Sequence, residues 1–232
     1  MSTEARPHLP PSDDVQDTLA LPPTASPGPE GDLPMSNPSP LTLCFAPEVE
    51  LTDDLFWKIC AANPELRLER TAEGNLEIMY PAGGESSRQN FTLAMRLGVW
   101  NEGRGEDAGV CFDSSAGFKL PSGATKGPDA SWIARDRWLA LTPEQRRVFP
   151  PICPDFVAEL RSPSDAKRKL RDKLREYLAN GARLGWLIDP LDGTVERYRP
   201  GQEPETLTRP ERLDGGDVLP GFVLDLSGIL FE

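Results

Sequence analysis

The chain has 232 residues, of which 38% are hydrophobic and 27% charged, and its formal net charge at pH 7 is −12. A protein with this net charge has little general electrostatic affinity for polyanions, although one part of its surface can still be basic. Its only histidine is His8, which excludes Ser-His-Asp and Cys-His catalysis and histidine metal sites from the rest of the chain. Chemistry there must rely on carboxylates, lysine, arginine, tyrosine or hydroxyl groups.

Residues 1–40 differ in composition from the rest of the chain. They hold ten prolines, six acidic residues and one arginine, with almost no aliphatic periodicity. We therefore predict a disordered tail, because such a segment cannot bury enough apolar surface to fold. The tail has no apolar run typical of a signal peptide or a membrane span, so a cytoplasmic protein is expected. Residues 41–232 are expected to form one domain.

The first elements expected after this tail are a short helix, a hairpin and a long helix. Thr52 is placed to cap the amphipathic pattern LTDDLFWKICAAN, whose first turn is acidic. Residues 68–80 have the pattern of two strands joined by a turn at 73–75. Residues 86–102 predict the first long helix. The apolar positions of that helix expected to face the core are Phe91, Met95, Leu97 and Trp100.

Short elements follow in the middle of the chain. Residues 110–120 predict a β segment that turns near 114–117, and residues 128–134 predict a further strand. Thr142 and Gln145 have the spacing of a capping box at the start of a short helix.

Two isolated carboxylates fall on predicted strands. In DFVAELR, alternation places Glu159 on the same face as Val157 and Arg161. Asp129 stands where the turn Lys126-Gly127-Pro128 leads into the strand at 128–134. Burying an unpaired carboxylate costs several kcal/mol, roughly, so each needs a cation, a proton or a metal beside it.

Two explanations fit this pair of carboxylates. Asp129 and Glu159 could share one hard divalent cation such as Mg²⁺, which takes oxygen ligands and needs only one or two from the protein. Alternatively, each pairs with an arginine or caps a turn. The pattern alone leaves both open.

A strongly basic helix is predicted next. The run Ser162-Pro163-Ser164-Asp165 has the composition of a helix start, and Gly181 is the expected end. Lys169 and Lys173 lie on the flank of the apolar stripe of this helix. Residues 161–175 contain seven basic side chains against two acidic ones, so the segment is locally positive. The stripe consists of Leu170, Leu174, Tyr177 and Leu178.

Strands complete the chain. A buried strand is predicted at 184–189, then a hairpin at Asp192-Gly193 into 194–198, and strands near 206–208 and 222–225. Helices and strands in this order predict an α+β fold with one central mixed sheet flanked by helices, extended by β additions at both ends.

Several short motifs follow one another in this order. They are PD at 128–129, E-x-R at 159–161 with SPSD after it, K-x-x-x-Y at 173–177, NG at 180–181 and WLIDP at 186–190. With LERTAEGNLEIMYPAGGESS upstream and YRPG and LPGFVLDL downstream, this set resembles the Uma2 family of the PD-(D/E)xK nuclease superfamily. The resemblance begins at about residue 43, and the ordered set is far more specific than PD and E-x-K alone.

The resemblance implies a restriction-endonuclease-like core and a Mg²⁺-dependent endonuclease that hydrolyses DNA phosphodiester bonds, with Mn²⁺ as a substitute. Asp129 and Glu159 would hold the metal, and Glu85 would be an additional carboxylate ligand. Arg161 stands at the sequence position where the superfamily usually has its lysine. The role of that lysine would be taken instead by Lys173 of the following helix. Arg161 and Lys169 would then contact phosphate.

The resemblance also implies DNA as the partner, bound through the basic helix at 165–179, and leaves a homodimer open, since duplex-cutting relatives are often dimers. No membrane partner is expected, because the sequence lacks an apolar run long enough for a span. Two other functions remain open. In the first, the chain is an inactive nuclease-fold binding module in which Arg161 neutralises Glu159. In the second, it is a hydrolase of a small phosphoester, which an acidic surface tolerates better than duplex DNA.

Overall fold

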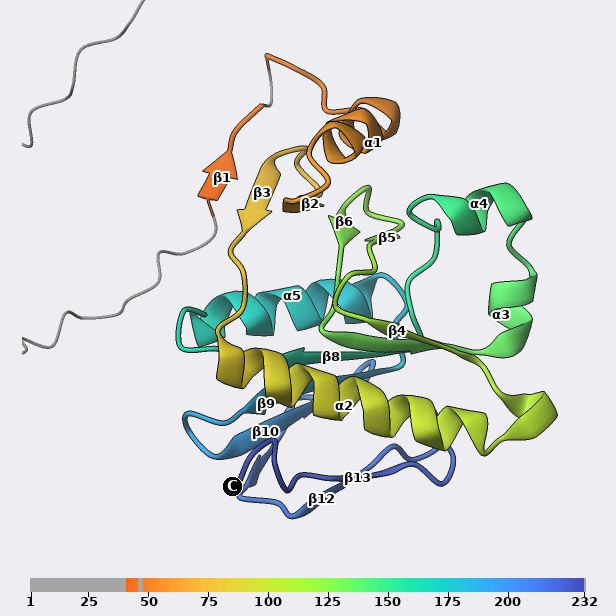
Figure 1. Ribbon diagram of the computed structural model, residues 1–232, viewed down its shortest axis with the longest axis vertical. Helices are drawn as coiled ribbons and strands as arrows, with labels where there is room; N and C mark the ends of the chain where they lie inside the picture. The colour runs from red at the N-terminus through yellow and green to blue at the C-terminus, as the bar shows by residue number, and fades with distance from the viewer. Residues whose placement is uncertain (1–40, 46–47, 232) are drawn as a thin grey trace, which may run out of the picture. The chain divides into compact units, whose positions relative to one another are not determined.

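A six-stranded mixed sheet forms the main core of the computed structural model, which describes residues 41–45 and 48–231 (Figure 1). The strand order is β11-β10-β9-β8-β7-β4. Strands β8 and β9 run parallel, and the other neighbours are antiparallel. The predicted tail at 1–40 lies outside the described residues. The strands are β4 (Val110–Asp113), β7 (Ala130–Ile133), β8 (Phe156–Leu160), β9 (Leu184–Asp189), β10 (Thr194–Tyr198) and β11 (Glu205–Thr208).

Two long helices, α2 (Gly84–Glu102) and α5 (Lys167–Ala179), cover the two faces of this sheet (Figure 1). All residues of the central strands β8 and β9 are buried. The apolar face of β8 shares a hydrophobic core with Leu93 and Leu97, and Val157 on its other face shares a core with Leu174 and Tyr177. The alternation predicted along β8 is therefore confirmed. The helices are α1 (Asp53–Ala62), α2 (Gly84–Glu102), α3 (Arg135–Leu139), α4 (Pro143–Arg147) and α5 (Lys167–Ala179), with a 3-10 turn η1 (Gly105–Asp107).

A second sheet of five strands has the order β1-β3-β2-β6-β5. Its hairpin β2–β3 is the one predicted at 68–80, and it packs with α1 around a small core of Leu51, Phe56 and Leu76. The Thr52 hydroxyl accepts a hydrogen bond from the Leu55 amide at 3.3 Å, which confirms the predicted cap. The strands are β1 (Leu41–Leu43), β2 (Arg67–Arg70), β3 (Leu76–Met79), β5 (Phe118–Lys119) and β6 (Thr125–Lys126); β12 (Arg212–Asp214) and β13 (Val223–Asp225) pair separately.

The predicted β segment at 110–120 is divided between the two sheets. Strand β4 pairs with β7, whereas β5 pairs with β6. Between them, the Asp113 carboxylate accepts hydrogen bonds from the amide and the hydroxyl of Ser115. This local turn leads the chain out of one sheet and into the other.

The buried face of α2 differs from the predicted one. Leu97 is buried as expected, but Phe91 is 69% exposed and Met95 45% exposed, and Leu93 takes the place of these two in the core. Apolar residues occupy two faces of this helix, so the 3.6-residue period fits both faces. Packing against the sheet selects the face of Leu93 and Leu97.

The basic helix α5 begins at Lys167, four residues later than the predicted first helical position Pro163, and Gly181 follows its end with φ of 108°. The Asp165 carboxylate accepts hydrogen bonds from the amide and hydroxyl of Ser162 at 2.9 and 2.6 Å. The run Ser162–Asp165 is thus a turn closed by its own side chains, which compete with helix formation.

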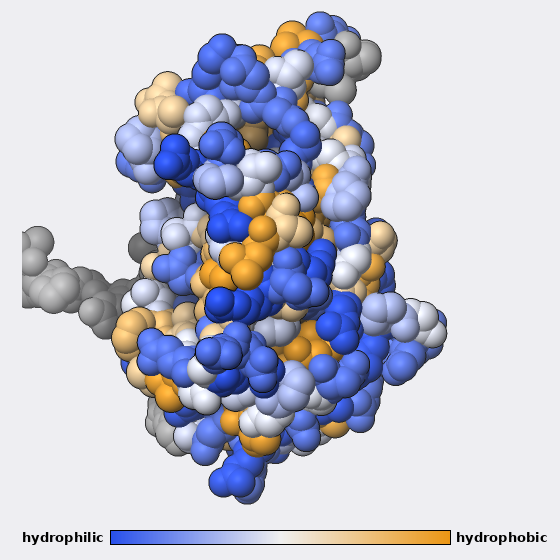
Figure 2. Space-filling model, turned by 90° about the vertical axis from the view of Figure 1, so that its right-hand side faces the viewer, coloured by the Kyte–Doolittle hydropathy of each residue, from blue (hydrophilic) through white to orange (hydrophobic). Residues whose placement is uncertain are grey.

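Figure 2 shows the face that carries α3 and α4, where hydrophobic residues surface in small groups among hydrophilic ones. Leu139, the last residue of α3, and Val148, which directly follows α4, are exposed apolar residues. No helix in the described part of the chain is long and apolar enough to cross a membrane.

Candidate functional site

A pocket of about 410 Å³ lies between the β2–β3 hairpin on one side and α5 and the start of β7 on the other. Three of the residues predicted from the sequence line it together: Asp129, Glu159 and Lys173. They come from different elements, and the antiparallel register of β7 and β8 sets Asp129 across from Glu159, since Ala130 pairs with Ala158.

Backbone pairing fixes the position of Asp129. Its amide donates to the Ala158 carbonyl at 3.0 Å, and its Oδ2 accepts from the Leu160 amide at 2.8 Å. The Asn90 amide group of α2 approaches Oδ1 at 3.5 Å, and an Arg67 nitrogen lies 3.9 Å from the same oxygen. Burial outweighs these contacts and raises the pKa of the Asp129 carboxyl.

Glu159 is a buried carboxylate on the central strand. Its side chain is 3% exposed, and Oε1 lies 3.0 Å from the Lys173 Nζ. This contact is an ion pair without good hydrogen-bond angles, because Oε1 has no hydrogen-bond partner among the described residues. Burial raises the pKa of Glu159 to about 8, although the charge of Lys173 acts in the opposite direction.

Lys173 points from α5 across the floor of the pocket. Its Nζ lies 3.0 Å from Glu159, 3.1 Å from the Glu69 carboxylate and 2.9 Å from the carbonyl of Gly127. Burial opposes its charge, but the carboxylates of Glu159 and Glu69 outweigh burial and raise the pKa of Lys173 above its ordinary value. Lys173 is therefore a fixed cation.

Glu69 of β2 is a site residue that the sequence prediction missed. It is 3% exposed, accepts a hydrogen bond from the Gly127 amide at 3.1 Å and lies 3.4 Å from the Lys126 Nζ. Burial raises its pKa, but Lys173 and Lys126 outweigh burial and lower it. The available signal was the alternation Leu68-Glu69-Arg70 at the start of the hairpin predicted at 68–80, which isolates a carboxylate on a strand in the same way as the alternation around Glu159.

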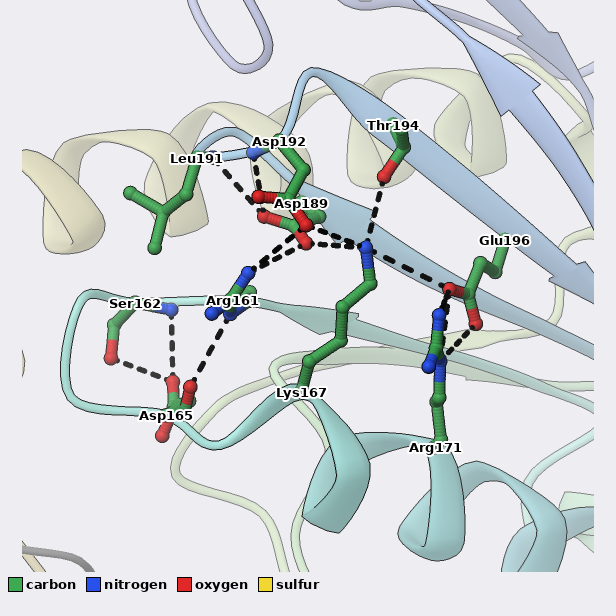
Figure 3. Close-up of polar contacts among 10 residues, drawn as sticks. All are labelled: Arg161, Ser162, Asp165, Lys167, Arg171, Asp189, Leu191, Asp192, Thr194 and Glu196. Atoms are coloured by element: carbon green, nitrogen blue, oxygen red, sulfur yellow. Dashed lines mark hydrogen bonds and ion pairs between the residues drawn. The ribbon is translucent and has the colours of Figure 1, made fainter.

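Arg161 does not line the pocket. Its guanidinium binds the carboxylates of Asp189 and Asp192 at 3.0 and 3.4 Å (Figure 3), so the suggested pair of Arg161 with Glu159 is wrong. Lys167 lies 2.8 Å from Asp189 in the same network.

Arg171 extends this network by forming an ion pair with Glu196, in which its Nε donates to both carboxylate oxygens at 3.0 Å (Figure 3). Much of the predicted basic surface is thus neutralised within the fold, because Arg161, Lys167 and Arg171 are all paired with acids of β9 and β10 or of the turn between them.

The two remaining predicted residues have different positions. Lys169 lines the pocket, is exposed and has no ion pair with any described residue. Glu85 does not line the pocket; its side chain is 65% exposed and forms an ion pair with Arg88. The structure thus separates Glu85 from Asp129 and Glu159, and it contains no group of three or more His, Cys, Asp or Glu residues arranged to hold a metal within the described ranges.

Comparisons with known proteins give the family and the fold of the chain. The model of the Uma2 family, described as "Putative restriction endonuclease", matches residues 53–227. The chain is similar to the crystal structure of a protein titled a "putative nuclease belonging to DUF820" from Anabaena variabilis ATCC 29413. The TM-score is 0.60 at 20% identity, and the similarity covers 72% of this chain and 90% of that chain. At this identity the likeness shows the fold. No curated protein matches the chain.

Proposed function

The chain belongs to the Uma2 family, and from this premise we propose that it is a metal-dependent endonuclease that hydrolyses DNA phosphodiester bonds. The observation that carries the proposal is the convergence of Asp129, Glu159 and Lys173 on one pocket. Two carboxylates and one lysine, brought together from three elements, are the groups that metal-assisted phosphoryl chemistry requires.

The two carboxylates suit a hard divalent cation. Asp129 and Glu159 are recessed, both have raised pKa values, and Glu159 Oε1 lacks a hydrogen bond from any described residue. These are signs of negative charge that the protein neutralises incompletely. Mg²⁺ takes few protein ligands and one or two carboxylates suffice, with Mn²⁺ as a substitute. When bound, the metal polarises a phosphate oxygen and lowers the pKa of water.

Lys173 serves the reaction as a cation and not as a base. Because Glu159 and Glu69 raise its pKa, it keeps its proton at neutral pH. A fixed ammonium at the floor of the pocket stabilises the negative charge that develops on a scissile phosphate. Glu69 and the Gly127 carbonyl hold this ammonium in place, so its position does not depend on Glu159 alone.

Asp129 is held in one orientation by the protein. Its Oδ2 accepts from the Leu160 amide, which leaves Oδ1 directed toward Asn90 and Arg67 at longer distances. A ligand held by one short hydrogen bond needs little rearrangement to bind a cation. Lys169, an exposed residue of the pocket wall, would contact a phosphate of the bound strand.

The test is cleavage of an end-labelled single strand and, separately, conversion of a supercoiled plasmid to its nicked or linear form, each with Mg²⁺, with Mn²⁺ and with a chelator. The wild-type protein should cleave with metal and lose activity with the chelator. Asp129→Ala should be inactive, whereas Arg168→Ala, which alters a side chain 92% exposed, should retain activity. Metal-independent cleavage, or an Asp129→Ala variant as active as the wild type, would refute the proposal.

A further inference from the structure

We infer that this site accepts an unpaired strand, either single-stranded DNA or a nucleotide turned out of the double helix, in preference to an intact duplex. The inference rests on the function proposed above and defines its substrate class. Three independent features of the pocket support it: the depth of the reactive groups, the charge of the walls and one exposed aromatic ring.

The reactive groups lie at the bottom of the pocket. The side chains of Asp129 and Lys173 are each 13% exposed, and that of Glu159 is 3% exposed. The hairpin β2–β3 and helix α5 form the walls of this partly open pocket, and its volume of about 410 Å³ is the size of a site for a small molecule. A phosphodiester inside a stacked duplex is held on the surface of a wide, stiff rod. Enzymes whose recessed sites act on a base of DNA reach it by using unpaired strands or by extruding a nucleotide, and the depth of the present groups favours the same kind of substrate.

The walls of the pocket are acidic. The lining residues include eight acidic and four basic side chains, and three of the four basic ones are engaged: Lys126 with Glu69 and Glu77, Lys173 with Glu69 and Glu159, and Arg67 with the Gly127 carbonyl. Only Lys169 has no ion pair within the described residues. Affinity for duplex DNA comes mainly from many contacts of lysine and arginine with phosphates. These walls offer few such contacts.

The basic helix does not supply the missing contacts. Lys167 and Arg171 of this helix, and Arg161 just before it, are paired with Asp189, Asp192 and Glu196 (Figure 3). The exposed Arg168 and Arg175 both pair with Asp172 of the same helix. Within the described residues, most cations of this region are thus paired with acids, which leaves few free contacts for the phosphates of a duplex and calls for another source of binding energy.

Tyr80 offers that source. It directly follows β3, lines the pocket and is 46% exposed, and its ring contacts no other aromatic ring in the described part of the chain. An exposed ring beside a recessed site is a platform on which an unpaired base can stack, and each such stack contributes to the binding free energy whatever the base. In a duplex, the bases are stacked on one another and present no free face.

The test compares one labelled sequence in three forms: single strand, perfect duplex, and duplex with a short central unpaired loop. Both cleavage with Mn²⁺ and binding with Ca²⁺, measured by fluorescence anisotropy, are followed for the full chain. The variants are Tyr80→Ala, Tyr80→Phe, and Phe91→Ala as a matched control, because Phe91 is an exposed aromatic residue that does not line the pocket.

The single strand and the looped duplex should be bound and cleaved, and the perfect duplex should react at least roughly tenfold more slowly. Tyr80→Ala should weaken binding of the single strand roughly tenfold, the size of one lost base–aromatic stack. Tyr80→Phe and Phe91→Ala should bind like the wild type.

Equal cleavage of the perfect duplex and the single strand would overturn this inference while leaving the nuclease function intact. Wild-type binding by Tyr80→Ala would likewise overturn the role of the ring. Absence of cleavage on all three substrates would refute the proposed function instead, and the anisotropy data would then still decide between unpaired and paired DNA.

Discussion

Lys173 of α5 and Glu69 of β2 form a buried ion pair, with 3.1 Å between Nζ and Oε1, that connects the helix to the five-stranded sheet. The same Nζ lies 3.0 Å from Glu159. Lys173 is therefore shared between a carboxylate that holds it in place and a carboxylate proposed to bind the metal. The ion pair with Glu69 therefore keeps the Lys173 ammonium in the pocket whether Glu159 pairs with Lys173 or binds the metal.

Removing the charge of Glu69 should disturb the site more than the fold. In Glu69→Gln, Lys173 loses one of its two carboxylates and pairs more tightly with Glu159, which then competes with the metal. Metal affinity and kcat should both fall, by roughly 10- to 100-fold as for other outer-shell partners of metal ligands. Isothermal titration with Mn²⁺ and steady-state cleavage measure the two quantities.

The control for this variant is Glu77→Gln. Glu77 lies on β3, next to the strand of Glu69, and its carboxylate is 2.6 Å from the Lys126 Nζ. It forms no ion pair with Lys173. It should leave metal affinity nearly unchanged. Equal losses in both variants would mean that Glu69 acts only through the general charge of the pocket.

Divalent metal should stabilise the folded protein through Asp129 and Glu159. A ligand that binds only the native state raises the melting temperature by mass action. Differential scanning fluorimetry with and without Mg²⁺ or Mn²⁺ should show an upward shift for the wild type and a much smaller one for Asp129→Ala and Glu159→Gln. Identical shifts in all three proteins would place the ion elsewhere.

Loss of Arg161 should destabilise the protein without abolishing cleavage. Its guanidinium contacts Asp189, which is 1% exposed, and leaving that carboxylate with fewer partners costs about 1–3 kcal/mol. Urea unfolding of Arg161→Ala should show this loss. Cleavage per folded molecule should stay close to that of the wild type, and a large loss of substrate binding would contradict the structural role.

The network around Asp189 predicts a specific dependence of stability on acid. Burial raises the pKa of Asp189, but hydrogen bonds from Lys167 and Arg161 outweigh burial and lower it below its ordinary value of 3.8. The ionised Asp189 therefore contributes its full stabilisation at a pH above the ordinary pKa. The stabilisation is lost as the pH falls from that value through the lower pKa of the folded state, because the unfolded chain takes up the proton first.

Asp189→Asn should remove this contribution. Its free energy of unfolding should fall less steeply than that of the wild type as the pH drops below about 4. Asp136→Asn, at an exposed position of α3, serves as the control and should follow the wild-type curve. Parallel curves for Asp189→Asn and the wild type would show that other groups dominate acid unfolding.

Local rules predicted the parts of the site that each depend on one element. Glu159 was found because alternation in DFVAELR isolates a carboxylate on a strand, and Asp129 because a turn leads it into the next strand. The hairpin at 68–80 and the capped helix at Thr52 followed from turn and cap residues alone. These patterns depend on neighbours in the sequence, which the sequence displays directly.

The remaining features depend on contacts between distant segments. Glu69 belongs to the site only because β2 lies beside α5 in the fold, and Arg161 leaves the site only because Asp189 ends the adjacent strand. Likewise, the two apolar faces of α2 are equivalent until the sheet covers one of them. No local pattern encodes which distant carboxylate meets which cation.

Cleavage by Lys173→Ala is the most direct test of the central claim that Asp129, Glu159 and Lys173 form one catalytic centre. The variant should fold, bind Mn²⁺ with at least wild-type affinity, since Glu159 is freed from its ion pair, and cleave no single-stranded DNA above background. Lys169→Ala, which alters the exposed lysine of the same pocket, should lose much less activity. A Lys173→Ala enzyme that cleaves at the wild-type rate would contradict the account.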